Sequence, residues 1–414
     1  MASLEASGPT RSQGNPRVVI VGAGPVGLSC ALALRALSCQ VEVLEADDEH
    51  KPRPGSRALF LHRDSLSLLE RFSPGLGRQL AAFGTRWRYR ETHYRGRLVY
   101  RKELLPEGEG AGWPAFASIR QPDTEALLRK ACSERGIPIR WGSKVAFVTA
   151  DATGVLVGGE GFQQRAEYLI AADGARSAIR KHIGVAMSGQ TAQGCHIVVD
   201  FQGDSGRFAE RRVFHYHHPL LDGRHVLIIP FAGGWQVDLQ CKEADDVDAM
   251  AEGDGLLRWL RHLVDADRIG AISWVSTYRF NQVVADDFSD PRRRVLLVGE
   301  AAHLFPPYGA RGLNSGVADA DAAASAIALA GHATSEERRI AAIEDFVRDR
   351  RVAALRNRDA AMQALHAIRT PTWGDALRQR AVREASRWWR PAARWLDAAP
   401  YGPAFIDERR STRY

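Results

Sequence analysis

Long hydrophobic runs are absent from this chain of 414 residues. No stretch approaches the roughly 18 apolar residues that a membrane-spanning helix needs, so we expect no membrane association. Residues 1–16 contain Ser, Gly, Pro and Asn without an apolar period. Because they lack the hydrophobic region of a secretory signal peptide, we expect them to form a disordered tail.

Cysteine and lysine are also scarce. The five cysteines, at positions 30, 39, 132, 195 and 241, are scattered and include no CxxC pair. This pattern predicts free thiols in a reducing cytoplasm, without a disulfide framework and without a metal site.

Only six lysines occur, so arginine carries most of the net charge of +7. The densest basic segment is Arg369–Arg394, which includes Trp388 and Trp389. Its spacing suits a helix with a solvated basic face and tryptophans that pack inward. A nucleic-acid-binding surface would present basic and aromatic side chains together in one exposed stripe. Because the tryptophans of this segment are expected to pack inward, we expect no nucleic-acid partner.

The chain does contain a glycine-rich turn between a strand and a helix. Residues 17–21 are a β-branched run typical of a buried parallel strand, and residues 26–37 have the pattern of a following helix. Gly22 permits a tight turn, Gly24 allows the backbone to approach a pyrophosphate, and Gly27 allows close packing of helix and strand.

A second strand, at residues 41–45, ends in Glu45. An acid about 20 residues after the glycine turn is placed to bind a ribose, while the helix N-terminus attracts the phosphates. Together these features predict a dinucleotide site of the adenosine kind.

Two further motifs follow. A strand at residues 167–172 leads into Asp173-Gly174, and Ser177 is placed to cap a short helix towards Arg180. Another strand, at residues 292–298, ends in Gly299-Glu300. A loop rich in Pro, Gly and Asn then precedes an alanine-rich helix at residues 313–329, and no packed core requires such a loop.

The three motifs, in this order and spacing, resemble those of the single-component FAD-dependent monooxygenases that hydroxylate aromatic rings, over roughly residues 17–330. The resemblance implies an α/β fold similar to that of para-hydroxybenzoate hydroxylase, without a C-terminal thioredoxin-like domain. Its parts would be a Rossmann-type FAD-binding domain, an inserted and mostly antiparallel β-sheet substrate domain, and a helical C-terminus.

The resemblance also implies which residues hold FAD, bound non-covalently. Glu300 would bind the ribityl chain, Arg57 would lie near the pyrophosphate and isoalloxazine, and Gln121 would face the ribityl or adenosine side. The complete expected set is Gly22, Ala23, Gly24, Pro25, Val26, Gly27, Glu45, Arg57, Gln121, Asp173, Gly174, Gly299, Glu300, Pro306, Gly309, Gly312, Leu313 and Asn314.

This chain departs from the family pattern at two points. The family usually has Gly-Asp where this chain has Gly299-Glu300, so the carboxylate stands one methylene further out. The loop reads Gly309-Ala310-Arg311-Gly312 where two successive glycines are commoner. We expect the site to survive both changes.

The resemblance and the strand pattern together suggest a division of the chain. The expected parts are a tail at 1–16, an FAD-binding domain at 17–184 and 291–330, a substrate domain at 185–290, and a helical region at 331–414. Within the substrate domain, four strand-like runs separated by Gly and Pro predict the antiparallel sheet. These runs are residues 196–201, 212–216, 225–231 and 235–240.

The activity implied by the resemblance is hydroxylation of an aromatic, phenolic substrate. NAD(P)H would reduce FAD, and O2 would form a flavin C4a-hydroperoxide that oxygenates the ring. Because the chain has no second GxGxxG domain, NAD(P)H would be a transient co-substrate. The candidate pocket residues are His215, Tyr216, Trp235 and Pro306, with His217 and His218 beside them.

Several alternatives stay open. The flavin motifs do not distinguish a hydroxylase from a Baeyer–Villiger or epoxidising oxygenase, or from a non-catalytic flavin-binding accessory protein. A halogenase is disfavoured because no Trp-x-Trp-x-Ile-Pro segment occurs. The oligomeric state is also open, with a homodimer among the options.

Overall fold

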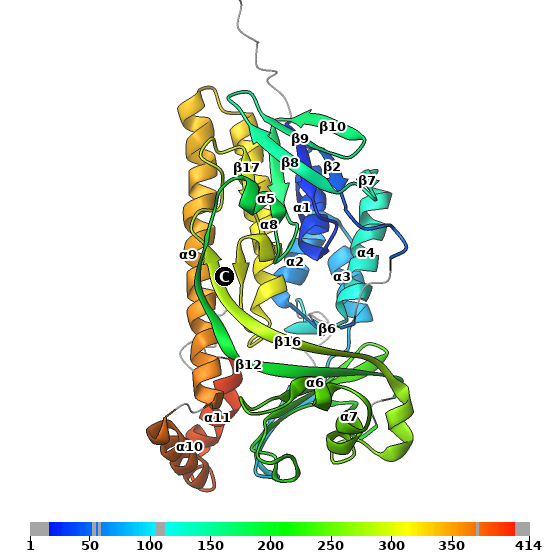
Figure 1. The fold of residues 1–414 in the computed structure, drawn as a ribbon, viewed down its shortest axis with the longest axis vertical. Coiled ribbons are helices and arrows are strands. Elements are labelled where there is room, and N and C mark those ends of the chain that lie inside the picture. Colours follow the sequence, from blue (N-terminus) through cyan, green and yellow to red (C-terminus); the bar gives the residue numbers. More distant parts are fainter. Residues whose placement is uncertain are drawn as a thin grey trace, which may run out of the picture.

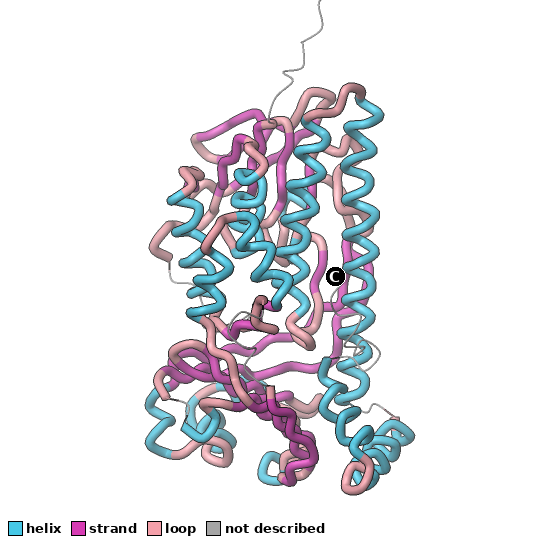
Figure 2. The backbone as a smooth tube through the Cα atoms, turned by 180° about the vertical axis from the view of Figure 1, so that it is seen from behind, coloured by secondary structure: helices cyan, strands magenta, loops and turns pink. Residues whose placement is uncertain are grey.

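A computed structural model describes residues 16–51, 55–56, 59–104, 112–204, 206–369 and 372–401. A parallel sheet with its helices forms one half of the molecule, and a larger sheet forms the other (Figure 1). A long helix runs along one side of both halves (Figures 1 and 2). Arg57 and residues 1–15 of the expected tail lie outside the described residues.

The smaller half is built on a five-stranded sheet with the order β17-β11-β1-β2-β7. All its strand pairs are parallel, and its three central strands are buried β-branched and aliphatic runs. The strands are β1 (Arg17–Val21), β2 (Gln40–Leu44), β7 (Ile139–Arg140), β11 (Tyr168–Ala171) and β17 (Val295–Leu297). The strands expected around the three motifs are therefore present, and β17, β11 and β1 lie side by side.

Helices cover this parallel sheet, and α1 packs against both α4 and α8. The helices of this half are α1 (Pro25–Ala36), α2 (Arg63–Phe72), α3 (Leu76–Phe83), α4 (Gln121–Glu134), α5 (Ala178–His182) and α8 (Arg311–Gly331). Two small antiparallel sheets accompany them, one of β3 (Phe60–His62) and β6 (Phe116–Ser118), the other of β8 (Val145–Ala150), β9 (Val155–Gly159) and β10 (Phe162–Ala166). All five cysteines are buried free thiols, as predicted.

The larger half is an eight-stranded sheet, with the order β18-β16-β12-β15-β14-β13-β4-β5, that is antiparallel except between β13 and β4. Its strands are β4 (Tyr89–Tyr94), β5 (Arg97–Glu103), β12 (Met187–Gln202), β13 (Arg211–Tyr216), β14 (Val226–Phe231), β15 (Gly234–Gln240), β16 (Ile272–Ala285) and β18 (His303–Leu304). The four expected strands are β12 to β15. Three strands come from outside residues 185–290, and β16 was not anticipated.

The two faces of this sheet differ in chemistry, because successive side chains of a strand point to opposite faces. One face is apolar and is covered by α6 (Val247–Ala251) and α7 (Gly253–Leu260). There Trp235 stacks on Phe201, with ring centroids 4.2 Å apart. The other face of β12 and β15 carries buried polar side chains, namely His196, Asp200, Gln236, Asp238 and Gln240.

The C-terminal region is helical, as expected, but it is divided differently from the prediction. Its helices are α9 (Glu336–Arg369), α10 (Trp373–Ala385) and α11 (Arg390–Ala398). Within the described ranges, every helix is too short or too polar to cross a membrane. Three-residue and six-residue 3-10 turns complete the fold, namely η1 (Gly206–Phe208), η2 (Pro219–Leu221), η3 (Ala266–Ala271), η4 (Gly299–Ala301) and η5 (Ala399–Tyr401).

The prediction that Trp388 and Trp389 pack inward is wrong. Their exposed fractions are 88% and 61%. The basic segment is not one helix, because α10 ends at Ala385 and Pro391 stands in the first turn of α11. A proline there suits a helix start but cannot continue a preceding helix, so the two tryptophans fall in the exposed connection.

Candidate cofactor and substrate site

The glycines of the first motif have two distinct roles. A Cβ on Gly22 would lie 2.4 Å from the carbonyl oxygen of Ala172, and one on Gly27 would lie 1.9 Å from that of Gly22. Both positions therefore require glycine for close packing. A Cβ on Gly24 would meet no atom within 4 Å, and α1 has no side-chain cap. The uncapped N–H groups and the open space beside Gly24 fit an approaching phosphate.

Glu45 lies directly beside this turn. Its carboxylate accepts hydrogen bonds from the N–H of Ala23 (2.6 Å) and the N–H of Asp47 (3.0 Å). The side chain is buried at the carboxyl end of β2. This position is the one expected for an acid that binds the ribose of a dinucleotide.

The second motif forms the predicted turn and cap. Ser177 accepts a hydrogen bond from the N–H of Arg180 (2.9 Å) and donates one to Asp173 (2.5 Å). The other carboxylate oxygen of Asp173 accepts from the N–H of Ile179 (3.1 Å). The Asp173 carboxylate thus fixes the start of α5, and the open space lies beside Gly174.

The three motifs converge on neighbouring strand ends. Gly22 packs against Ala172, just before the second motif, and the side chain of Val26 lies against Gly299 of the third. Val26 also contacts Gly316, one turn into α8. The carboxyl ends of β1, β11 and β17 therefore lie side by side, at the edge of the sheet where open α/β sheets bind ligands.

Glu300 follows β17 within η4, and its side chain is exposed. Gly299 before it has a φ of 56°, a left-handed conformation that favours glycine. The backbone turn expected at the Gly-Asp position of the family is therefore kept, with the longer carboxylate directed away from the packed core.

Asp319 is a buried residue of this site that sequence reasoning missed. It accepts hydrogen bonds from the Gly299 N–H (2.9 Å), from Nε2 of His303 (2.7 Å) and from Nε of Arg350 (2.7 Å). Burial alone would raise the pKa of Asp319, but the charges and hydrogen bonds of His303 and Arg350 lower it to about 2. Asp319 therefore joins η4, β18, α8 and α9 through one carboxylate.

The N-terminus of α8 is also uncapped by any side chain, and it follows Ala310 in a left-handed conformation. A Cβ on Gly312 would meet no atom within 4 Å. Arg311, in place of the usual glycine, donates to Oδ1 of Asn357 (3.0 Å) and to the carbonyl oxygen of Tyr401 (3.0 Å). The arginine points towards the C-terminal helices and leaves the start of α8 accessible.

Asn314 holds this loop in place with its side chain. Its amide group donates to the carbonyl oxygens of Phe60 (2.9 Å) and Ala310 (2.7 Å). Its oxygen accepts from the N–H of His62 (2.9 Å) and from Ser65 (2.6 Å). Because these partners occupy the Asn314 side chain, any contact of Asn314 with a cofactor would be made by its backbone.

Gln121 begins α4, as its position before Pro122 predicted. Its side chain donates to Glu125 (2.9 Å), and its N–H donates to the carbonyl oxygen of Ser56 (3.1 Å). Ser56 in turn binds Asp200 of the large sheet through its N–H and its hydroxyl, both at 2.8 Å. Ser56 is thus tied to the polar face of the sheet.

The four candidate pocket residues occupy different places. Pro306 is buried in the loop between β18 and α8. Tyr216 is fully buried, and its hydroxyl donates to the carbonyl oxygen of Leu396 (2.8 Å), so it anchors α11. His215 alternates with Tyr216 and points to the other side of β13. Trp235 belongs to the apolar core under α6 and α7, away from the polar face, which corrects its choice as a pocket residue.

Sequence reasoning also missed four polar residues on the face opposite Trp235. Nδ1 of His196 lies 2.5 Å from Oδ1 of Asp238, and its Nε2 lies 3.3 Å from the hydroxyl of Tyr308. Tyr278 donates to the second oxygen of Asp238 (3.3 Å). The strand alternation contained the signal for His196 and Asp238, since both neighbours of each are apolar core residues, whereas Tyr278 lies on β16, which was not anticipated.

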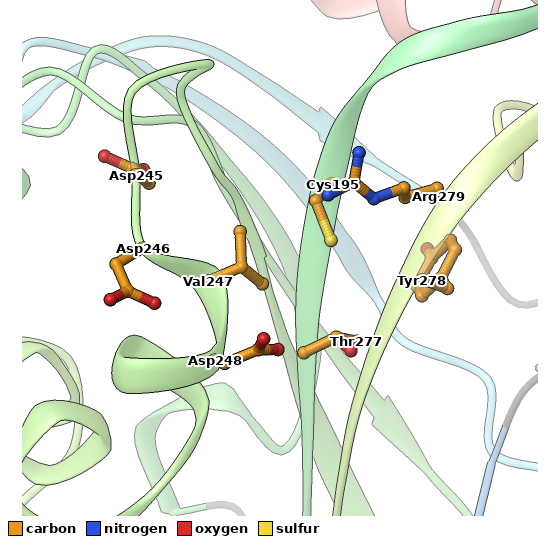
Figure 3. A pocket seen from close by; sticks show the side chains of 8 residues that line it. All are labelled: Cys195, Asp245, Asp246, Val247, Asp248, Thr277, Tyr278 and Arg279. Atoms are coloured by element: carbon orange, nitrogen blue, oxygen red, sulfur yellow. The ribbon is translucent and has the colours of Figure 1, made fainter.

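A separate pocket of about 290 Å³ lies between strands β12 and β16 and the start of α6. Figure 3 shows its lining side chains, which come from β12, β16 and the segment around the start of α6. Of its three carboxylates, Asp245 binds Arg224 and Asp246 caps α6. None of the three motifs contributes to it. The described part of the chain contains no group of three His, Cys, Asp or Glu side chains suited to a metal ion.

Comparison with known proteins agrees with this geometry. The family model described as "FAD binding domain" matches residues 15–358. The chain belongs to the family of FAD-dependent monooxygenases. Its fold is the α/β fold of these flavoproteins, with an antiparallel sheet and a helical C-terminus, as predicted from the motifs.

Curated relatives share about 30% identity. Rifampicin monooxygenase from Streptomyces venezuelae is 30% identical over 325 residues, which are 73% of this chain and 62% of the relative. Para-nitrophenol 4-monooxygenase from Pseudomonas sp. is also 30% identical over 325 residues, covering 75% of this chain and 77% of the relative. The chain spans less than two thirds of the length of several of these relatives, including 57% of 6-methylpretetramide 4-monooxygenase from Streptomyces rimosus.

Solved structures show the same fold. The p-nitrophenol 4-monooxygenase PnpA from Pseudomonas putida superposes with a TM-score of 0.74 and 23% identity, covering 93% of this chain and 98% of PnpA. The flavin-dependent monooxygenase PieE, solved with FAD and substrate, gives a TM-score of 0.73 and 22% identity, over 95% of this chain and 73% of PieE.

Proposed function

We propose that this protein is a monooxygenase that uses non-covalently bound FAD, NAD(P)H and O2 to hydroxylate a phenolic ring. The observation that carries the proposal is the convergence of the three motifs on the adjacent ends of β1, β11 and β17. The starts of α1 and α8 both lack a side-chain cap, and the two helices pack against each other.

The residues present fit FAD. Gly24 and the start of α1 would receive the pyrophosphate, Glu45 would bind the adenosine ribose, and Glu300 would reach the ribityl hydroxyls. The start of α8 would place its positive dipole end near the flavin ring. When bound, FAD would supply hydride acceptance from NAD(P)H and the activation of O2.

The protein itself would position the aromatic ring and exclude water. Tyr308, in the loop before α8, contacts His196 on the polar face of the large sheet, and Pro306 of the same loop is buried. The apolar cluster on that side, which includes Phe214, Tyr216 and Phe280, would surround a ring. The names of the relatives include a nitrophenol and a pretetramide as substrates, which supports a phenolic substrate here.

The test is NAD(P)H oxidation by the FAD-loaded full chain, with and without a panel of phenols that includes p-nitrophenol and polycyclic phenols. We expect at least one phenol to stimulate oxidation and to gain one oxygen on its ring. Fragmentation of the product separates ring hydroxylation from oxygen insertion into a carbon–carbon bond. Flavin binding without any stimulated oxidation would instead indicate a flavin-binding accessory protein.

A further inference from the structure

We propose that Tyr308, His196 and Asp238 form a proton relay that removes the hydroxyl proton of the aromatic substrate. This inference rests on the proposed function and names the part of the site that selects an ionisable hydroxyl. Tyr308 stands in the loop of the third motif, before α8, whereas His196 of β12 and Asp238 of β15 belong to none of the three motifs.

The sheet register brings His196 and Asp238 together. His196 is opposite Tyr278 of β16, while Asp238 is opposite Val198, two residues further along β12. Diagonal neighbours on one face of a sheet are close enough for long polar side chains to meet. Tyr308 reaches this pair from the loop that connects β18 to the uncapped start of α8. The relay therefore lies between the large sheet and the expected flavin position.

The hydrogen bonds of His196 leave its Nε2 as the atom that can accept a proton. A carboxylate accepts but does not donate, so the 2.5 Å contact with Asp238 requires a proton on Nδ1 of His196. In the neutral imidazole, Nε2 is then the acceptor, and the Tyr308 hydroxyl lies 3.3 Å from it. Tyr278 fixes the second oxygen of Asp238 and so holds the carboxylate in this orientation.

Burial makes a merely structural role a poor explanation for these side chains. His196 is 4% exposed, Asp238 is 8% exposed and Tyr308 is 9% exposed. Buried histidine–carboxylate pairs are costly to desolvate, and apolar residues of similar size would often stabilise a fold equally well. Phe280 packs edge-on against the His196 ring, so an apolar residue would suit this position.

Two further groups contribute to the electrostatics of the relay. Burial, followed by the charge of Asp238, raises the pKa of Tyr308, and Arg369 opposes this shift. The Tyr308 hydroxyl therefore stays protonated and can pass a proton without becoming a stable base. His225, whose pKa burial lowers to about 3 with smaller contributions from His217 and His196, stays neutral beside the relay.

The proton step balances without any other reactant. The substrate O–H donates its proton to the Tyr308 oxygen, while Tyr308 passes its own proton to Nε2 of His196. The O–H bond of the substrate breaks, and a new N–H bond forms on the imidazole. The products are a phenolate, whose ring carbons are richer in electrons, and an imidazolium paired with the Asp238 carboxylate.

The test compares wild type with His196→Gln in the FAD-loaded full chain, using p-nitrophenol as the probe. The visible band of the nitrophenolate reports directly how much of the bound probe is ionised. In wild type, we expect the bound probe to be ionised even at mildly acidic pH. In His196→Gln, we expect a neutral bound probe at the same pH and hydroxylation about 100-fold slower, at the lower end of general-base effects. That slower rate should rise with pH as the probe ionises.

Two further variants and one control distinguish the loss of the proton relay from misfolding of the protein. Asp238→Asn and Tyr308→Phe interrupt the same relay with small changes in volume, and both should give the same pH profile as His196→Gln. The control is His93→Gln, which alters another histidine of the large sheet that is paired with a carboxylate, Glu91, at 3.2 Å. The control should keep the wild-type profile. Flavin content and thermal melting confirm that each variant is folded.

Equal ionisation of the bound probe in wild type and His196→Gln, or no bound anion in either, would overturn the relay. If phenols still stimulate NAD(P)H oxidation equally in both proteins, the proposed function stands and only the relay fails. If no phenol stimulates oxidation in the flavin-loaded wild type, the proposed function itself fails.

Discussion

Replacing Asp319 by Asn removes the carboxylate that joins the third motif to the helices behind it. Asp319 is completely buried and accepts hydrogen bonds from Gly299, His303 and Arg350. Asn keeps the size of the side chain, but it loses the charge and replaces one acceptor oxygen with a donor. At least one of the three partners must then lose its hydrogen bond in the interior.

The magnitude follows from two independent considerations. Removing one member of a buried ion pair typically costs about 3–5 kcal/mol, because the remaining charge stays buried without compensation. The pKa of Asp319 is lowered from 3.8 to about 2, which corresponds to roughly 2 kcal/mol of stabilisation by the charged form. We therefore expect Asp319→Asn to lower the free energy of unfolding by about 3 kcal/mol.

The sign of the pH dependence also follows. A carboxyl group whose pKa is depressed by folding stabilises the protein above its unfolded pKa, and this stabilisation is lost as the pH falls through the folded value. Wild type should therefore lose stability between about pH 4 and pH 2 more steeply than Asp319→Asn, which lacks this titration.

Urea denaturation, followed by the signals of tryptophan and flavin, measures the effect. The control is Asp321→Asn, two residues further along α8, where a partly exposed carboxylate pairs with Arg71 at 2.6 Å. Surface pairs contribute about 0–1 kcal/mol, so this control should be nearly neutral. A loss in Asp319→Asn no larger than that of the control would refute the reasoning.

Four other substitutions test neighbouring parts of the account. Gly24→Val should abolish flavin binding while circular dichroism shows an intact fold, and flavin retained by this variant would place the cofactor elsewhere. In contrast, Gly27→Val should lower the melting temperature, because its Cβ would lie 1.9 Å from a carbonyl oxygen. Glu300→Ala should weaken FAD binding by about 1.5–3 kcal/mol in titrations of the apo-protein, and an unchanged Kd would remove Glu300 from the site. Trp388→Ser should change the free energy of unfolding by less than about 0.5 kcal/mol, since the indole is exposed, and a larger loss would show that it packs against the fold.

The local geometry of the first two motifs could be predicted because it depends on residues close together in the sequence. Gly22, Gly24 and Gly27 act within one turn, and Glu45 follows one strand later, so their spacing in the sequence determines their geometry. Ser177 caps the residue three positions on, which is also a local interaction.

The residues that sequence reasoning missed depend on pairings between distant segments. Asp319 looks like either of the two acids in an alanine-rich helix, and only the fold shows that it faces Arg350 and His303. Alternation along β12 and β15 places His196 and Asp238 on one face, but the order of strands in the sheet decides which face is covered by α6 and α7.

The central claim is that the three motifs form one FAD site that serves oxygenation of a phenolic ring. The most direct measurement is a turnover of the FAD-loaded chain with NAD(P)H and isotopically labelled O2, with the product analysed by mass spectrometry. The account predicts one labelled oxygen on the aromatic ring for each molecule of product. Oxidation of NAD(P)H that yields only peroxide with every phenol tested, or a product oxygen that comes from water, would contradict it.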